Sequence, residues 1–434
     1  MNGSSHPLRT GADERSLGPD AVRALAALLV VYLHACVPYL VHPMPSLVWP
    51  VIDASSALCD PLFWSIEVFI MPLFLVISGF YGYRAYQNKD GAGFLKARAR
   101  RLLSPLLFGM LVILPIDLYI WMLGLIAEGH MSMSKLRSLK VPSPHGDHLW
   151  GLSHLWFLLY VFLYAAVMAF ACRSIRPFQI PMRVRPALRH ATIWVLGIVG
   201  TATLIWAPEV VFDFQHATLP VPSKWLYSST FFAGGVALAI FDPQFRIVNR
   251  LSSRHLALGA AATVAVVALG RWTLRMQDAN MDEATTNWHA RVSLAGMTVL
   301  GAWMMSLGII GMANRIAPRL ERRTRTANGI RYLAGASFWI YLVHHPVLGV
   351  VHINLKWLTP SLSPFAKSLL SLLIAVGWAV LSYEWMVRST RFGGWIGVTS
   401  GKRNEQANDS GKLEDQSPSD DQKPSKPHSI RIAA

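Results

Sequence analysis

The sequence predicts an all-α polytopic membrane protein, a bundle of about ten transmembrane helices. Of its 434 residues, 53% are hydrophobic and only 15% are charged, and the mean hydropathy of +0.36 exceeds that of soluble domains. The apolar runs are continuous rather than alternating with a period of two, which argues against a membrane β-barrel. A water-soluble enzyme is disfavoured on the same composition.

Ten apolar runs are long enough to cross a hydrocarbon core of about 30 Å as helices. We predict them, to within a few residues, at 20–40, 62–83, 103–126, 155–171, 191–207, 224–241, 256–270, 291–313, 332–353 and 364–387. The chain then divides into an N-terminal segment, 1–19, a transmembrane domain, 20–395, and a tail, 396–434. The tail is rich in Ser, Asp, Lys, Gln and Pro, a composition that predicts disorder.

The formal charge of +16 comes from 40 Lys and Arg against 24 Asp and Glu. Thirty of the 40 basic residues fall in every second connecting segment or at the two ends of the chain. This asymmetry is the positive-inside pattern, which predicts an even number of spans and both termini in the cytoplasm. The charge therefore indicates a multi-pass membrane protein, with the bilayer as partner and no nucleic acid. The first run lacks a cleavage site after it, so we expect it to be retained.

The first predicted helix carries two ionisable residues on one face. Arg23 and His34 are eleven residues apart, about three turns, so they lie about 16 Å apart along the axis. Placing an Arg at the centre of a transmembrane helix costs about 2.5 to 3.5 kcal/mol of insertion free energy, so such a residue is expected to have a function. Snorkelling of Arg23 and an ordinary core role for His34 remain the alternative for each residue alone.

Counting about 1.5 Å per residue from the helix ends places four ionisable side chains at one depth: His34, Glu67, Asp117 and His344. We expect them to share a polar cavity. The ninth helix has a polar face of its own, in which Ser337, Tyr341, His344 and His345 follow helical spacing. Pro346 next to it frees a backbone carbonyl one turn earlier. Histidines near an outer boundary also bond headgroups or loops, which is the alternative for His345.

Polar residues also gather at the predicted inner boundary. Glu384 is close to the level of Arg23 and is expected to neutralise it in a structural ion pair. Ser78 and Gly79 allow close backbone approach at the end of the second helix. Arg84 then starts a loop that presents basic residues suitable for a polyanionic nucleotide, although topology alone would also produce them: Arg84, Lys96, Arg98, Arg100 and Arg101.

Several of these segments together resemble the membrane acyltransferase-3 family, and within it the glucan biosynthesis protein C group of succinyltransferases. The resemblance lies in the Arg and His eleven positions apart, the ISGF end of the second helix and the basic RARRLLSP segment. It continues in residues 152–164, 337–349 and 381–392 and extends to about residue 400. One departure is Ile70, where many relatives carry a basic residue.

The resemblance implies an O-acyltransferase of a bacterial inner membrane that takes an acyl group, expected to be succinyl, from cytoplasmic acyl-CoA. The acceptor is then a hydroxyl of a periplasmic glucan or another cell-surface glycan. It implies no bound cofactor and no metal.

The residues suit acyl transfer to a hydroxyl, which needs a general base, groups that bind the thioester donor, and hydrogen-bond donors to the oxyanion. His34 is the expected base, with Glu67 or Asp117 as its orienting carboxylate. Arg23 is expected to hold the donor. Candidate donors to the oxyanion, or ligands of an acyl carboxylate, are Tyr341, Ser337 and His344. Direct attack and a covalent acyl-enzyme relay both remain open.

The acceptor is expected on the outer loops, where Trp150, Trp156, Trp272 and Trp288 can stack on sugars or simply anchor at the interface. A metal site at His145, Asp147, His148 and His154 fits no strong template. Three cysteines give no disulfide framework, and pairing of Cys36 with Cys59 is left open. The rival function is a secondary transporter or exporter of a glycan, although no repeated halves are evident. The sequence does not fix the acyl group, the glycan or the oligomeric state.

Overall fold

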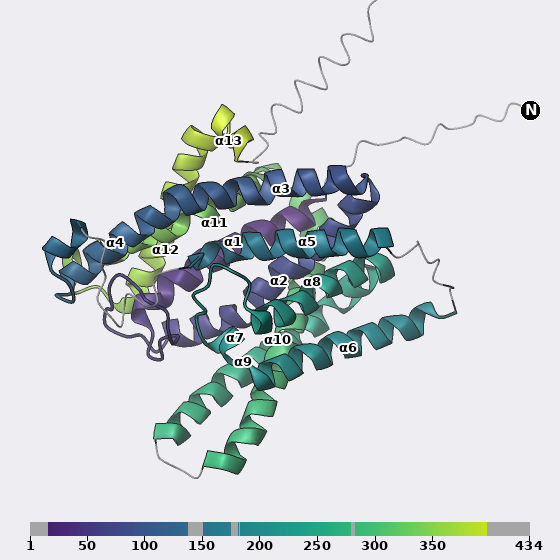
Figure 1. The fold of residues 1–434 in the computed structure, drawn as a ribbon, viewed down its shortest axis with the longest axis horizontal. Helices are drawn as coiled ribbons and strands as arrows, with labels where there is room; N and C mark the ends of the chain where they lie inside the picture. The colour runs from purple at the N-terminus through teal and green to yellow at the C-terminus, as the bar shows by residue number, and fades with distance from the viewer. Residues whose placement is uncertain (1–15, 138–150, 175–180, 182, 279–282, 397–434) are drawn as a thin grey trace, which may run out of the picture.

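The computed structural model describes residues 16–137, 151–174, 181, 183–278 and 283–396. Within these ranges the chain is helical and contains no strand. Nine of the described helical segments are long and apolar enough to cross a membrane. Figure 1 shows the long helices running beside one another, with α6 along one edge and the linked ends of α9 and α10 projecting beyond the rest. The predicted all-α membrane bundle is confirmed.

Each of the ten predicted spans falls on a helix. The first five spans are α1 (Leu17–Cys36), α2 (Cys59–Gln87), α3 with α4 (Gly91–Phe108 and Leu114–Ala127), α5 (Trp156–Ser174) and α6 (Arg185–Trp206). The other five are α8 (Pro222–Phe241), α9 (Arg246–Asp278), α10 (Glu283–Glu321), α11 (Thr324–Leu358) and α12 (Pro364–Ser382). Short helices η1 (Val37–Tyr39), η3 (Met133–Arg137), η5 (Ser153–Leu155), α7 (Glu209–Phe212) and α13 (Arg391–Trp395) lie between or after them.

Helix α8 is the predicted span that is absent from the nine apolar ones, because it carries polar residues that it buries inside the protein. Lys224, Ser228 and Thr230 are at most 9% exposed. Its close contact with α2 depends on glycines. A Cβ on Gly79 would lie 2.1 Å from the carbonyl oxygen of Phe232, and one on Gly235 would lie 2.1 Å from that of Val76. The predicted close approach at Gly79 is therefore confirmed.

The third span begins earlier than predicted and is interrupted. The segment expected as a basic loop is helical from Gly91, where the Asp90 side chain accepts a hydrogen bond from the Gly93 N–H and caps α3. Farther along, Pro115 has no N–H to offer the carbonyl of Leu111. The helix widens to a π-helix, η2 (Gly109–Ile113), before α4 continues. Lys96, Arg98, Arg100 and Arg101 thus lie on a helix rather than on a loop.

Burial separates the central helices from the peripheral ones. In the apolar stretches of α1 and α11, 61% and 72% of the residues are buried, against 17% in α6 and 22% in α9. Large apolar side chains are exposed on the outer helices, including Phe170, Trp194, Leu373 and Leu381. Such a surface suits lipid rather than water. The ionisable residues of α1 and α11 therefore lie at the centre of the bundle.

Candidate active site

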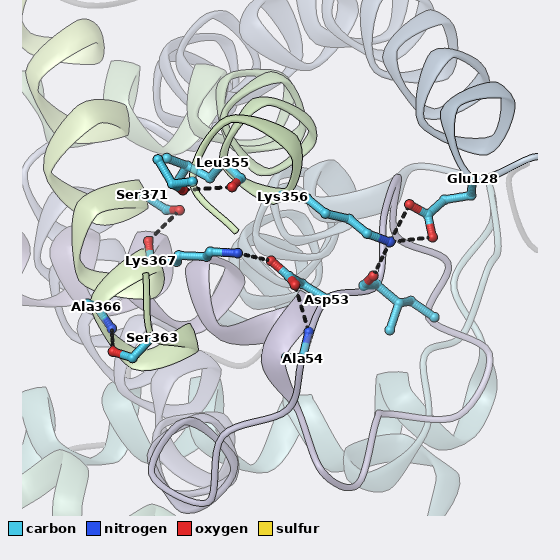
Figure 2. A network of polar contacts seen from close by, with 11 residues as sticks. Asp53, Ala54, Glu128, Leu355, Lys356, Ser363, Ala366, Lys367 and Ser371 are labelled. Carbon is cyan, nitrogen blue, oxygen red and sulfur yellow. Dashed lines mark hydrogen bonds and ion pairs between the residues drawn. The ribbon is translucent and has the colours of Figure 1, made fainter. Parts of the chain in front are cut away.

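The segment 40–58 between α1 and α2 folds over the end of α1 and is held by ion pairs (Figure 2). Lys367 Nζ lies 2.7 Å from Asp53 Oδ2, and the Lys367 side chain is only 3% exposed. Lys356 Nζ lies 2.5 Å from Glu128 Oε1 and also donates to the carbonyl of Ile52 at 2.7 Å. These contacts fix the segment to α11, α12 and the end of α4.

Through this segment Trp49 is placed over a group of histidine rings. Its indole N–H donates to His352 Nδ1 at 2.9 Å, and its ring centroid lies 5.1 Å from those of Trp121 and His345. Trp121 in turn donates to the carbonyl of Val48 at 2.9 Å. The aromatic residues therefore form an apolar cover on one side of the histidines.

Four histidines make up the group, which we call the histidine cluster: His34, His154, His344 and His345. The His34 centroid lies 5.0 Å from that of His344 and 5.5 Å from that of His345. The His154 centroid lies 5.2 Å and 4.7 Å from the same two rings. The rings come from α1, η5 and α11. The predicted meeting of His34 with His344 is thus observed, and His154 and His345 join them.

Hydrogen bonds to backbone carbonyls define how His34 and His344 present their lone pairs. His34 Nδ1 lies 2.8 Å from the oxygen of Val30, and His344 Nδ1 lies 2.7 Å from the oxygen of Tyr341. A carbonyl only accepts, so Nδ1 carries the proton and Nε2 of the neutral ring carries the lone pair. In the part of the chain that the structure describes, the buried Nε2 of His344 has no hydrogen-bond partner.

His345 has a carboxylate partner. Its Nδ1 lies 3.0 Å from Asp117 Oδ2, and both side chains are less than 10% exposed. Asp117 follows the π-helix that Pro115 induces, a distortion that often marks functional sites. Asp117 thus orients His345, whereas it was one of the two carboxylates, with Glu67, that we expected to orient His34. The reason is that His34 gives its Nδ1 proton to its own helix.

His154 is positioned by the proline that follows His345. Pro346 cannot donate to the carbonyl of Leu342, and His154 Nε2 lies 3.3 Å from that oxygen. The carbonyl predicted to be free is therefore bonded by an imidazole from another element. Tyr341 fixes the same residue by donating its hydroxyl to the backbone oxygen of His154. Nδ1 of His154 is then a buried acceptor, and it has no partner among the described residues.

Three members of this region bring possible metal ligands together. One donor atom from each of Asp117, His154 and His345 lies within 4.8 Å of the others. The rings of His154 and His345, however, are stacked, with 23° between their planes. Lone pairs lie in the ring planes, so two rings stacked face to face direct them side by side rather than toward one common ion. The arrangement suits proton transfer better than metal binding.

A cavity of about 1000 Å³, including its open mouth, adjoins the cluster on one side. His34, His154 and Tyr341 line it, as do the charged residues Glu67, Asp213 and Lys224. Glu67 was expected at this depth, and the structure places it in the same cavity as His34. Lys224 Nζ lies 3.9 Å from the centroid of Trp156, over its ring. The rest of its wall is mostly apolar, with residues such as Leu33, Val68 and Leu75, so the first cavity holds charged and aromatic groups within an apolar lining.

A second cavity, of about 1080 Å³ including its opening, adjoins the cluster from α4. Asp117 and His345 line it, and the remaining wall is mostly apolar, with Met110, Leu114 and Trp121. Leu47 and Phe214 line both cavities. The histidine cluster therefore lies between two cavities, of which the first carries Glu67, Asp213 and Lys224 and the second adjoins the His345–Asp117 pair.

The basic residues expected to bind the donor gather at the other end of α1. Arg98 and Arg101 are close enough to repel each other, and so are Arg101 and Arg23. The Arg84 guanidinium lies 5.7 Å from the centroid of Phe80. Arg23 also forms an ion pair with Asp20 at 3.8 Å. Arg23 thus belongs to a cationic group about 16 Å along α1 from His34.

Other expected site residues lie elsewhere. Glu384 forms an ion pair with Arg388 at 2.8 Å and accepts from the Tyr332 hydroxyl, whereas we predicted a pair with Arg23. Ser337 donates to the carbonyl of Ala334 in its own helix. Ser78 lies half-buried on α2. Glu384 therefore has a surface counter-ion of its own, and Ser337 is occupied by its backbone.

The remaining expectations concern cysteines and outer-loop residues. Cys36 and Cys59 are buried free thiols that interact with each other. Trp156 lines the first cavity, whereas Trp272 and Trp288 are exposed. Residues Trp150, His145, Asp147 and His148 lie outside the described residues, as do the two terminal segments apart from residues 16–19 and 396.

Two buried cations were missed by reading the sequence. Arg23 was expected inside the first span, but its side chain is 36% exposed. Lys224 and Lys367 are 9% and 3% exposed. Both stand near the start of predicted apolar runs, and that position assigned them to helix ends. The sequence feature that could have revealed them is a lysine in the first turn of a run that is otherwise apolar.

These features define a multi-pass membrane protein with a buried cluster of acid–base groups at the centre of its helix bundle. The family model described as an acyltransferase domain matches residues 16–384, and the chain belongs to this acyltransferase-3 family.

The chain is 26% identical over 378 residues to the glucans biosynthesis protein C of Salmonella paratyphi B, Salmonella enteritidis and Salmonella typhi. Each alignment covers 84% of this chain and 90% of the relative. No solved structure matches the chain. The resemblance stated from the sequence motifs is confirmed.

Proposed function

We propose that this protein is an O-acyltransferase of a bacterial inner membrane, which moves a succinyl group from cytoplasmic acyl-CoA to a hydroxyl of a periplasmic glucan or another cell-surface glycan. The observation that carries the proposal is the histidine cluster, because it places imidazole lone pairs inside the bundle of an acyltransferase-family protein. The glucan follows the name of the relatives, and the succinyl group follows the family resemblance of the sequence motifs.

His34 acts as the base that removes the proton of the acceptor hydroxyl. Its Nδ1 proton is given to Val30, so Nε2 of the neutral ring is the basic atom beside the first cavity. Glu67 and Asp213 can accept hydrogen bonds from sugar hydroxyls there, and Trp156 contributes an aromatic wall. The first cavity is in this proposal the acceptor site.

Lys224 provides the positive charge that faces the developing oxyanion. Tyr341 and Ser337, expected as donors, already give their hydroxyl protons to backbone carbonyls. Lys224 lines the cavity with His34 and is nearly buried, so its charge acts there at low dielectric. Arg23, Arg98 and Arg101 hold the phosphates of the donor at the far end of α1.

The test is His34→Ala, with His352→Asn as the matched control. His352 is a buried histidine that lines neither cavity described here, and Asn keeps an acceptor for the Trp49 N–H. We expect cell-surface glucan from the His34→Ala strain to lose its acyl substituents in mass analysis, while the control retains them at equal protein abundance. Removal of a general base costs about 10² to 10⁴-fold in rate.

Two results would contradict the proposal. Wild-type levels of substituents in the His34→Ala strain would remove the catalytic role of the residue. Accumulation of unsubstituted glucan in the cytoplasm would instead favour an exporter, the rival function for a membrane protein with an internal polar cavity.

A further inference from the structure

The proposed function uses the first cavity and His34 but not the second cavity or the His345–Asp117 pair. The pair differs from the other histidines because its imidazole is bonded to a carboxylate rather than to a carbonyl. A carboxylate stabilises the protonated ring, so His345 is the member of the cluster best suited to hold and release a proton. It faces the second cavity, whereas His34 faces the first.

One wall of the second cavity and two arginines of the cationic group belong to the same helical span. A single span, from Gly91 to Ala127, carries Arg98 and Arg101 near one end and Met110, Leu114 and Asp117 farther along. Met110 is nine residues from Arg101 and Asp117 is sixteen, which correspond to a rise of about 14 Å and about 24 Å. A ligand with a polyanionic head and a long, thin, mostly apolar arm fits this combination.

We propose that the second cavity receives the thioester end of the acyl donor and that His345, held by Asp117, is the acid that protonates the departing thiolate. This inference rests on the proposed function and assigns one cavity to each substrate. The first cavity, whose wall carries Glu67, Asp213 and Lys224, takes the hydroxyl, and the second, whose wall carries the His345–Asp117 pair, takes the thioester arm. The histidine cluster between them is where the two reacting groups meet.

The step balances as follows. The acceptor oxygen attacks the thioester carbon while its proton passes to His34 Nε2. The carbon–sulfur bond breaks, and the sulfur takes the Nε2 proton of protonated His345. An unprotonated thiolate in an apolar cavity would be a buried, unpaired charge, which is costly. The products are an ester and a free thiol.

The cluster then returns to its starting state without an outside proton. His34 ends the step with one additional proton, and His345 with one fewer. The ring centroids of His34 and His345 are 5.5 Å apart. The His344 ring lies 5.0 Å from that of His34 and 6.1 Å from that of His345, and the His154 ring lies 4.7 Å from that of His345. The unpartnered Nε2 of His344 and Nδ1 of His154, seen among the described residues, are acceptors available to such a transfer.

The experiment compares two donors of the same acyl group, the coenzyme A thioester and an aryl thioester. The aryl thiol is more acidic, so it leaves as a thiolate without needing a proton. The variant is His345→Asn, whose amide keeps a donor for Asp117 and lacks an acid at the Nε2 position. We expect kcat/KM to fall about 100-fold with the coenzyme A thioester and less than about 5-fold with the aryl thioester.

Companion variants separate this role from a structural one. Asp117→Asn acts through His345 and should show a smaller loss with the same dependence on the leaving group, while His352→Asn should match the wild type with both donors. Equal losses of His345→Asn with both donors would overturn the inference, and so would the same donor dependence in His352→Asn. His34→Ala should lose activity with both donors. A wild-type protein that transfers from neither donor would overturn the proposed function, and the inference with it.

Discussion

Two groups of buried polar side chains lie next to each other in this protein and differ in how completely they are paired. Along segment 40–58 the charges of Asp53, Lys367, Lys356 and Glu128 are matched in pairs (Figure 2). In and beside the histidine cluster, acceptor atoms of His154, His344 and Asp117 have no hydrogen-bond partner among the described residues. Buried polar groups are usually satisfied, so the paired group indicates stability, whereas the unpaired atoms of the cluster and of Asp117, which adjoin the two cavities, indicate function.

The largest effect is expected from Lys367→Ala, which tests whether the paired charges stabilise the protein. The substitution leaves the Asp53 carboxylate, 13% exposed, without the ammonium that lies 2.7 Å away. Removing one partner of a buried pair costs about 3 to 5 kcal/mol. We expect the free energy of unfolding of the detergent-solubilised protein to fall by that amount.

The double variant Asp53→Asn with Lys367→Met is the control, because it removes both charges and leaves no ion unpaired. It should recover most of the lost stability. A single variant as stable as the wild type would show that the ion pair does not fasten segment 40–58.

In the histidine cluster, His344→Leu should have the opposite effect, with little change in stability and a loss of activity. The substitution removes a buried Nε2 that has no partner within the described residues and replaces it with an apolar side chain of similar size. We expect the free energy of unfolding to change by less than about 1 kcal/mol, and acyl transfer to fall about 10-fold. A loss of stability as large as that of Lys367→Ala would place His344 in the structural group.

Much of the fold was predictable because lipid imposes one pattern on every span. Continuous apolar runs located a helix in each of ten places, although α8 is not among the nine apolar segments because it carries polar residues that face inward. The start of α3 was not predictable in this way. Its first turns are basic and amphipathic, and only the Asp90 cap marks where the helix begins.

The site was predictable in depth but not in pairing. Rise per residue brought His34, Glu67 and His344 to one level, and the structure gathers them around one cavity or cluster. Rotation about each axis decides which side chains touch, and Pro115 and Pro346 alter it locally. For this reason Asp117 meets His345 and not His34.

The smallest expected effect tests the one ion pair that we predicted from depth. Glu384 was expected to neutralise Arg23, but the structure pairs it with Arg388 one turn away, where the two side chains are 51% and 43% exposed. Exposed pairs at this spacing contribute about 0.5 kcal/mol or less and weaken with salt. We expect Glu384→Gln to lower the free energy of unfolding by no more than that, and to lose the effect at high ionic strength. A larger loss that persists in salt would mean that Glu384 compensates the cationic group around Arg23, and would move it from the surface pairs to the donor site.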